Sequence, residues 1–265
     1  GTRCQLCPDF RHRRRLQLPC YLCVMSKDHH SPQTIRELLS ANEARNLTRS
    51  VRAALLSGTE DYTQIGHVLL NFPGRLHVPD DWEQRLEELP VSKDGTPEDE
   101  KQSRLDLVGD FLDEITQSLA DEMEAWAGMV TDFDRLYCSI LDMRAEGVDI
   151  WVFDDWGSVD SEDEEVGVAV IPFDIADDLD LREVVIDFYI RSEAGRVAEA
   201  VQIIVETLES YGLNPEWDED ATGPVRGPIS VRMNWQPHSI LKEGWDDLYD
   251  TPEEYKASLA VPLSE

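Results

Sequence analysis

The stretch Ile229-Ser-Val-Arg-Met-Asn-Trp235 alternates apolar with polar side chains over its whole length. A period of two places the apolar residues on one face of a β-strand and the polar residues on the other. Strands with one solvated face are typical of antiparallel sheets. The other predicted strands are 148–153, 166–171, 184–190 and 213–217. We therefore expect a mostly antiparallel sheet in the C-terminal half of the chain.

Helices are predicted both before and after the first of these strands in the sequence. Thr96 starts a long helix in which apolar side chains recur at three- and four-residue intervals over 108–126. Thr131 caps a second helix, which ends before Gly147. A third helix is expected over 195–211 and would pack on the sheet.

Shorter helices are predicted nearer the N-terminus. Ser31 and Pro32 provide an N-cap and a proline at the first helical position. The apolar pattern that follows slips near residues 40–43 and then resumes up to Gly58, which predicts two short helices or one broken helix. Further short helices are expected around 65–70 and 82–89.

These elements predict an α+β protein with an N-terminal Cys4 zinc module, a helical middle and a C-terminal, mostly antiparallel sheet with packed helices. The expected regions are a zinc module (1–30), a helical region (31–128), an acidic α+β domain (129–235) and a C-terminal docking segment (236–265). A capping box at Thr251 and Glu254 predicts a short helix in the last segment.

Two Cys-x2-Cys pairs lie close together near the N-terminus, Cys4 with Cys7 and Cys20 with Cys23. Two such turns facing each other supply four thiolates to a tetrahedral Zn²⁺ and leave no position open for a substrate. The spacing therefore predicts one structural zinc ion in a module that resembles a zinc ribbon. The alternatives are two disulfides, a redox pair or an iron–sulfur site, and disulfides would require an oxidising compartment.

The loop between the cysteine pairs carries a cluster of arginines, Arg11, Arg13, Arg14 and Arg15. Arginines displayed together on a small rigid module fit phosphate backbones or an acidic protein surface. Nucleic acid is therefore one candidate partner for this module. In the alternative interpretation, these arginines pair with the protein's own carboxylates.

Charge is distributed unevenly along the 265 residues, which hold 24 basic and 55 acidic side chains for a net charge of −31. Residues 1–53 contain 10 basic and 4 acidic side chains, whereas residues 54–265 contain 14 and 51. So negative a segment repels nucleic acids and anionic membranes and attracts cationic partners. The alternative is an acidic composition that serves solubility at high salt.

The segment after the first predicted strand concentrates carboxylates, namely Asp154, Asp155, Asp160, Glu162, Asp163, Glu164 and Glu165. We interpret it as a solvated acidic hairpin that contacts a basic protein partner. Ca²⁺ or Mg²⁺ are alternative ligands, although the spacing does not match an EF-hand loop.

No motif in the chain specifies a reaction. Gly-x-Ser-x-Gly, a phosphate-binding glycine loop and a dinucleotide fingerprint are all absent from the sequence. His67, His77 and His238 have no nucleophile beside them in sequence, and Cys138 lies on an apolar helical face, where a buried thiol is expected. The sequence leaves enzymatic activity undecided and favours a non-enzymatic role.

Neither a secretory signal peptide nor an apolar stretch long enough to span a membrane is evident in the sequence. We therefore expect a cytoplasmic protein that does not enter the membrane.

Residues 126–235 resemble DUF6891, an actinobacterial domain family of unknown function. The resemblance is carried by Trp126-Ala-Gly-Met-Val-Thr-Asp-Phe-Asp-Arg-Leu136, Arg144-Ala-Glu-Gly-Val148, Tyr211-Gly-Leu-Asn-Pro-Glu-Trp-Asp218 and the alternating stretch that ends at Trp235. It implies no particular activity. Members of the family carry cysteines in the loop after the first strand, whereas the corresponding loop here, 153–165, has none. The resemblance therefore implies no cysteine-based role for this chain.

Three functions are consistent with these features. The leading hypothesis is an acidic interaction protein with a structural zinc module, such as an inhibitor or immunity protein that mimics nucleic acid and binds a basic partner. The first alternative is a zinc-dependent DNA- or RNA-binding or ribonucleoprotein-associated factor. The second alternative is a hydrolase that uses clustered carboxylates and a divalent metal.

The zinc module leads to a direct prediction. Elemental analysis of the protein purified from its own host should find one zinc per chain, because four thiolates complete a closed tetrahedral site. Replacing Cys4 and Cys20 by serine should remove that zinc, whereas Cys138→Ser should retain it. An intact pair of disulfides with no zinc would contradict the prediction.

Overall fold

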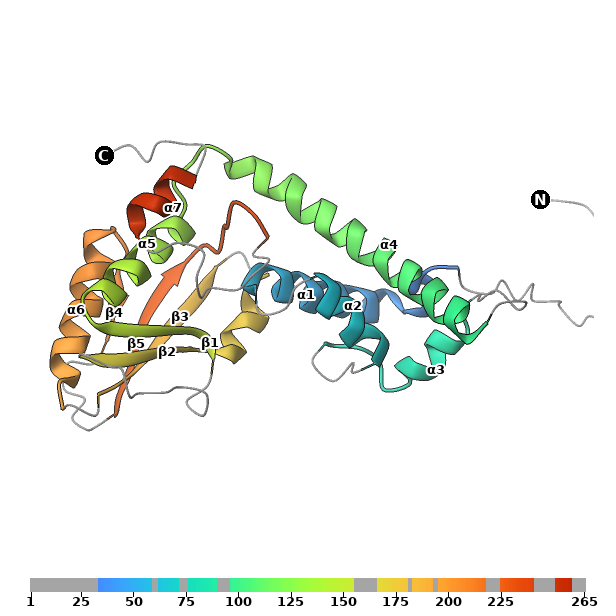
Figure 1. Ribbon diagram of the computed structural model, residues 1–265, viewed down its shortest axis with the longest axis horizontal. Coiled ribbons are helices and arrows are strands. Elements are labelled where there is room, and N and C mark those ends of the chain that lie inside the picture. The colour runs from blue at the N-terminus through green and yellow to red at the C-terminus, as the bar shows by residue number, and fades with distance from the viewer. Residues whose placement is uncertain are drawn as a thin grey trace, which may run out of the picture. The chain divides into compact units, whose positions relative to one another are not determined.

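The computed structural model describes residues 33–58, 62–71, 76–89, 96–154, 166–180, 183–192, 195–217, 225–240 and 251–258. These residues form a mixed helix and sheet structure, which confirms the predicted α+β class (Figure 1). The predicted zinc module, 1–30, lies outside the described residues.

Helix α1 (Ala41–Ser57) begins and ends at strong local signals. The hydroxyl of Ser40 accepts the Glu43 N–H, and the Glu43 carboxylate accepts the Ser40 N–H at 2.7 Å, which forms a capping box. Gly58 ends the helix in the left-handed conformation, with φ of 68°. The apolar turn before α1 is the short 3₁₀ helix η1 (Ile35–Leu38), which is capped by Thr34 and not by Ser31 as predicted.

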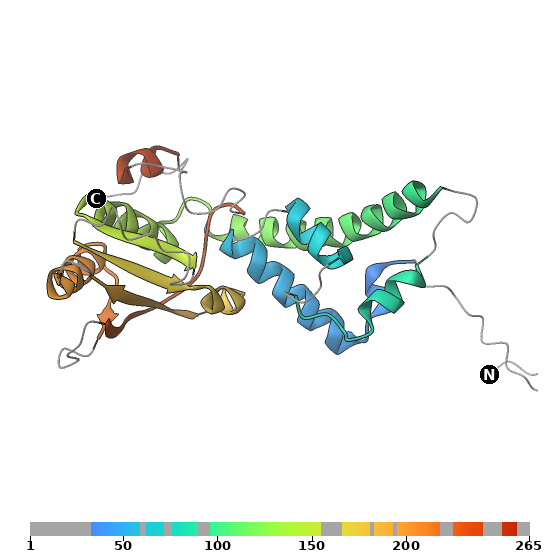
Figure 2. The ribbon, with the colours of Figure 1, turned by 60° about the horizontal axis from the view of Figure 1, so that its bottom comes forward.

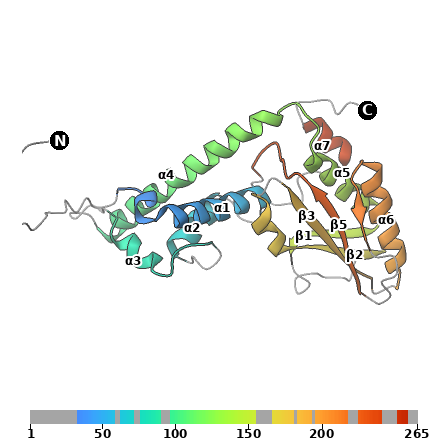
Figure 3. The ribbon, with the colours of Figure 1, turned by 180° about the vertical axis from the view of Figure 1, so that it is seen from behind.

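Three further α-helices lie in the described residues between α1 and the sheet-region helix that starts at Asp132. They are α2 (Tyr62–Asn71), α3 (Trp82–Glu87) and α4 (Pro97–Met123), followed by the 3₁₀ turn η3 (Glu124–Trp126). The cap of α4 is the predicted one, since Thr96 and Asp99 form a capping box before Pro97. At 1.5 Å per residue, α4 is about 40 Å long, and it packs against α1 and α2 (Figures 1 and 3).

The sheet has the strand order β1-β2-β3-β5-β4. Its strands are β1 (Val148–Asp154), β2 (Gly167–Pro172), β3 (Val184–Arg191), β4 (Pro215–Glu216) and β5 (Val225–Met233). Every neighbouring pair is antiparallel except β1 and β2, so the predicted mostly antiparallel sheet is confirmed.

Helices α5 (Asp132–Ala145) and α6 (Val197–Ser210) pack against each other and against the sheet (Figure 2). At the end of β2 the chain forms the 3₁₀ helix η4 (Phe173–Asp178), which contacts α1. The C-terminal helix α7 (Pro252–Ser258) packs on α5 through Tyr255, which is buried. The helical and sheet regions share one hydrophobic core within the compact unit Pro32–Glu265.

The parallel pairing of β1 and β2 corrects one expectation. A hairpin joins two antiparallel strands, whereas the strands that flank the acidic segment 155–165 run in the same direction, with Val148 opposite Gly167. The predicted acidic hairpin is therefore wrong. Alternating hydrophobicity does not distinguish the two pairings, because the side-chain period is two in both.

A β-bulge near the end of β1 redirects one aromatic side chain. The register with β2 shifts between Val152 and Asp154, and Phe153 between them has φ of 56°, which is rare for a residue other than glycine. Two successive residues, Val152 and Phe153, consequently break the alternation, and Phe153 is buried with only 5% of its surface exposed. The bulge brings the Phe153 ring to the indole of Trp235, at a centroid distance of 5.7 Å.

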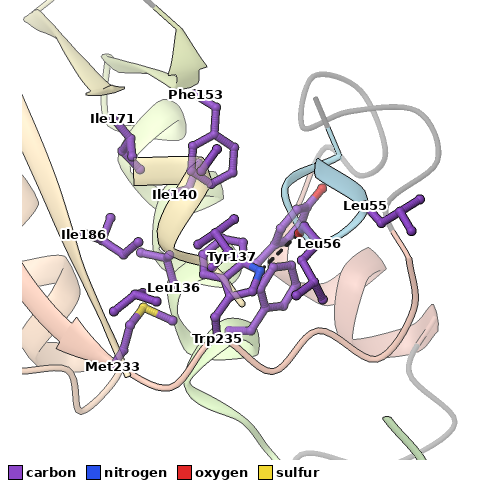
Figure 4. Packing of buried hydrophobic residues seen from close by; sticks show 14 of the residues in the cluster. Leu55, Leu56, Leu136, Tyr137, Ile140, Phe153, Ile171, Ile186, Met233 and Trp235 are labelled. Carbon is purple, nitrogen blue, oxygen red and sulfur yellow. Dashed lines mark hydrogen bonds between the residues drawn. The ribbon is translucent and has the colours of Figure 1, made fainter. Parts of the chain in front are cut away.

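Trp235 occupies the junction between the helical part and the sheet (Figure 4). Its ring packs edge-on against Phe133 of α5 at 5.0 Å, and its Nε1–H donates a 3.1 Å hydrogen bond to the carbonyl of Leu56 in α1. The last four carbonyls of a helix have no partner within the helix. Trp235 therefore satisfies a buried acceptor at the end of α1 while filling the core between three elements.

This junction predicts separate effects of packing and hydrogen bonding. Trp235→Ala should lower the free energy of unfolding by about 3–5 kcal/mol, because it removes a buried aromatic side chain. Trp235→Phe retains most of the packing but leaves the Leu56 carbonyl without its donor, so a loss of about 1–3 kcal/mol is expected. Urea denaturation of both variants measures the difference. Met129→Ala, at an exposed position, should change stability by less than about 0.5 kcal/mol.

Candidate functional site

Most of the site residues predicted from sequence lie outside the described residues. This holds for the zinc ligands Cys4, Cys7, Cys20 and Cys23, for the arginines Arg11, Arg13, Arg14 and Arg15, and for Asp155, Asp160, Glu162, Asp163, Glu164 and Glu165. Asp154 is described and is the last residue of β1, where its side chain is half-buried. The structure therefore leaves the zinc site and the acidic segment as predictions.

The described residues contain a second concentration of carboxylates, on the solvent side of α4 and at the start of η3. We call it the acidic stripe; its members, all exposed, are Asp106, Asp110, Asp113, Asp121 and Glu124. At 100° per residue these positions fall within about a quarter of the helix circumference. The basic residues of α4, Lys101 and Arg104, fall on the opposite side by the same geometry. The stripe is thus an acidic face that contains no basic side chain of α4.

Neutral groups provide the hydrogen bonds to this stripe. Gln102 donates to Asp106 at 2.8 Å, Gln117 donates to Asp121 at 2.7 Å, and the hydroxyl of Tyr62 donates to Asp113 at 2.8 Å. Among the residues that the structure describes, no ion pair involves a member of the stripe. The carboxylates are therefore oriented, yet their charge is not neutralised.

The pKa of Tyr62 is affected by the negative charge of the stripe. Burial raises the pKa of Tyr62, and the hydrogen bond to Asp113 and the charges of Asp113 and Asp110 raise it further, to about 12. A phenolate at this position would add a negative charge beside two carboxylates. The hydroxyl therefore stays protonated and acts as a donor at neutral pH.

Arginines from the surrounding helices form ion pairs with other carboxylates of α4, which are not part of the stripe. Arg36 donates to Glu114 at 2.8 Å and lies over the ring of Phe111, with 5.5 Å between the guanidinium carbon and the ring centroid. Arg52 of α1 donates to both carboxylate oxygens of Glu122, at 3.0 and 2.6 Å, and to Asp180 after η4. These pairs connect helices and leave the outer face of α4 acidic.

The charge density of the stripe limits what it can imitate. From Asp106 to Glu124 the helix advances about 27 Å, so successive charges are about 7 Å apart. Duplex DNA carries one charge per about 1.7 Å of its axis, and one strand carries one per about 3.4 Å. The stripe alone therefore has a lower charge density along its axis than duplex DNA or a single strand. It fits a basic protein surface better than a cleft that requires a full duplex.

A buried polar network lies where α7 meets α5. Asp134, of which 1% of the side chain is exposed, accepts a 2.7 Å hydrogen bond from Tyr255 and one of 2.8 Å from the N–H of Thr131. Nε2 of His238 lies 3.0 Å from Oδ2 of Asp134, the oxygen that also accepts the Thr131 N–H, whereas Tyr255 donates to Oδ1. Burial and the charge of Asp134 raise the pKa of Tyr255, which keeps this hydroxyl a donor. No local pattern indicates this network, since Tyr255 and His238 lie more than 100 residues from Asp134 in the sequence.

The His238–Asp134 pair resembles half of a catalytic triad, but no described side chain completes it. Cys138 is one turn further along α5, where burial raises its thiol pKa to about 12, so it is protonated at neutral pH. The Ser50 hydroxyl is bonded to backbone groups, since it donates to the Leu47 carbonyl and accepts the backbone N–H of His77. The predicted burial of Cys138 is confirmed.

No metal site is formed by the described residues, since no group of three or more His, Cys, Asp or Glu side chains lies close enough together to hold an ion. The carboxylates near the end of β2 are partly used by arginines, because Asp178 pairs with Arg49 and Asp180 with Arg52. The second metal that the hydrolase hypothesis requires is therefore not provided by this part of the chain.

Comparisons with known proteins found no relative of this chain. No protein-family model, no curated protein and no solved structure matches it. None of the described helices is both long and apolar enough to cross a membrane.

The Asp134 network predicts how α7 is held. Tyr255→Phe removes one hydrogen bond to a buried carboxylate and should lower the free energy of unfolding by about 1–3 kcal/mol. Hydrogen exchange should become faster than in the wild type, and the increase should be larger for the amides of α7 than for those of α5. Tyr62→Phe removes an equivalent tyrosine–aspartate bond on α4 and serves as the matched control. Its α7 amides should exchange at the wild-type rate. Equal protection of α7 in the wild type and Tyr255→Phe would contradict the role of this bond.

Proposed function

We propose that this chain is a non-enzymatic binding protein whose acidic surface receives a basic protein partner. The observation that carries the proposal is the acidic stripe, in which five exposed carboxylates follow one face of α4 and the turn after it, and three of them accept hydrogen bonds from neutral donors. Among the residues that the structure describes, the stripe forms no ion pair, so its charges are available to an external cation.

The composition of the chain supports the same partner. A net charge of −31 attracts basic proteins over a distance comparable to the Debye length, about 8 Å at physiological salt, and accelerates their association. It also repels nucleic acid from most of the surface. A complex formed through these charges should weaken as ionic strength rises.

The N-terminal module has a separate place in this proposal. The donor set of Cys4, Cys7, Cys20 and Cys23 fits one tetrahedral Zn²⁺, which would stabilise a small segment that holds little apolar surface. The nearby arginines could contact the same partner complex or nucleic acid. We place the protein in the cytoplasm, where thiolates remain reduced and available to zinc. The resemblance to DUF6891 is also part of the proposal, and it adds no activity.

The partner class can be identified by native mass spectrometry of the protein purified from its own host. A bound basic protein supports the proposal. Bound RNA or DNA supports the alternative, in which the arginine cluster binds phosphate. In that case Arg13→Glu, Arg14→Glu and Arg15→Glu together should abolish the nucleic-acid affinity.

Charge reversal tests the stripe once a partner has been identified. Asp106→Lys, Asp110→Lys and Glu124→Lys together should weaken the complex at least tenfold, about 1.4 kcal/mol, because attraction becomes repulsion at three exposed positions. Isothermal titration calorimetry at two salt concentrations measures the loss and its salt dependence.

The matched control carries the same change in net charge at exposed positions elsewhere, namely Glu206→Lys, Glu209→Lys and Glu216→Lys. It should lose much less affinity than the stripe variant. Equal losses in both variants would show that only the net charge matters and that the stripe is not the contact surface.

A further inference from the structure

A small cleft lies beside the end of the acidic stripe, at the junction of α1, the last turn of α4 and the turn after η4. Its volume is about 280 Å³. Pockets for drug-sized ligands have volumes of about 300–1,000 Å³. The cleft therefore has the size for one side chain or a small molecular fragment.

Apolar side chains form most of the walls. Leu119 and Met123 come from α4, Trp126 from η3 and Trp235 from the segment after β5. Both indole N–H groups are already used, since Trp126 donates to the Pro237 carbonyl at 3.0 Å and Trp235 donates to Leu56. The indoles therefore offer no free donor to a ligand, and the ring surface available to it comes mainly from the half-buried Trp126, since Trp235 is only 5% exposed.

Three charged side chains complete the cleft, Arg52, Glu122 and Asp180. Arg52 directs its guanidinium to both carboxylates, so the site contains two negative charges and one positive charge. The side chains of Arg52 and Asp180 are only 15% and 16% exposed, whereas that of Glu122 is 49% exposed. Oδ2 of Asp180 accepts no hydrogen bond within the part of the chain that the structure describes.

The net negative charge of the cleft favours a cationic ligand over an anionic one. Burial raises the pKa of Asp180 even though the hydrogen bond from Arg52 lowers it, so one guanidinium does not fully compensate the buried carboxylate. An anion would have to displace Glu122 from Arg52 and enter a site that is already negative. A cation would neutralise the excess charge.

We propose that this cleft receives the side chain of one lysine or arginine of the basic partner. The aliphatic stem lies against Leu119, Met123 and the Trp126 ring, and the cationic head reaches Glu122 and Asp180. This inference rests on the proposed function and deepens it, because the stripe attracts the partner while the cleft fixes one of its residues in a defined position.

Side-chain analogues test the cleft without the partner. Propylguanidinium and butylammonium are titrated into the full-length, ¹⁵N-labelled protein at constant ionic strength, and the indole N–H signals of Trp126 and Trp235 are followed. Single Trp→Phe variants assign these signals. Trp82 is the internal reference, because its indole is buried elsewhere and donates to the Leu69 carbonyl.

The expected result is a saturable shift of the Trp126 and Trp235 signals at millimolar analogue, with the Trp82 signal unchanged. Butanol tests the stem alone and should bind at least fivefold more weakly, and butyrate should not bind. Saturable binding of butyrate, or no saturable shift with either cation, would overturn the inference.

A matched pair of variants separates the cleft from general charge. Glu122→Gln removes one negative charge from the cleft, retains a hydrogen-bond acceptor for Arg52 and should weaken cation binding about fivefold. Glu114→Gln makes the same change at the carboxylate that pairs with Arg36, outside the cleft, and should leave binding unchanged.

The two proposals fail in different ways. If the analogues do not bind while charge reversal of the stripe still weakens the partner complex, the cleft is wrong and the proposed function stands. If the analogues bind but no basic partner is found, the proposed function is wrong.

Discussion

The hydrogen bond from the Trp235 indole to the Leu56 carbonyl joins the helical part of this protein to its sheet. The carbonyl belongs to the last turn of α1, where no amide of the helix can reach it. Because Trp235 is also packed against Phe133 and Phe153, the end of α1 is fixed to the core of the sheet region. The same arrangement occurs in α2, where the Trp82 indole binds the Leu69 carbonyl at 2.7 Å. Indole donors thus satisfy a carbonyl in the last turn of each of these two helices.

The fixed position of α1 determines which carboxylates its arginines pair with. Arg52 lies one turn before Leu56 and is directed at Glu122 of α4 and at Asp180, so the basic side chain is used inside the junction. Arg36 and Arg49 are used similarly, on Glu114 and Asp178. Since the chain has fewer than half as many basic as acidic residues, pairing arginines between the described elements leaves an excess of acidic side chains, which includes the acidic stripe.

Local signals predicted much of this fold, because caps and periodicity act within a few residues. The Thr96 and Thr131 caps, the apolar face of α4 and the alternation in β5 all agree with the structure. The parallel pairing of β1 with β2, the bulge at Phe153 and the contact of His238 with Asp134 depend on residues distant in sequence, so no local pattern indicates them. The acids of the stripe follow helical spacing in the sequence too, but which of them are exposed and lack an ion pair depends on the packing of α4 against the other helices.

The acidic stripe does not contribute to the stability of the helix that carries it. Like charges three or four residues apart on a helix are destabilising by about 0.2–0.5 kcal/mol per pair, so the pairs within the stripe cost about 1 kcal/mol in total. The opposite face of α4 buries Val108, Phe111, Leu112, Ile115 and Leu119, and each of these contributes about 1.5–3 kcal/mol. Burial therefore exceeds the repulsion several-fold, and α4 remains folded with its charges unpaired. A cationic partner would remove this repulsion on binding, so the relief of repulsion among the stripe carboxylates would contribute to the binding free energy.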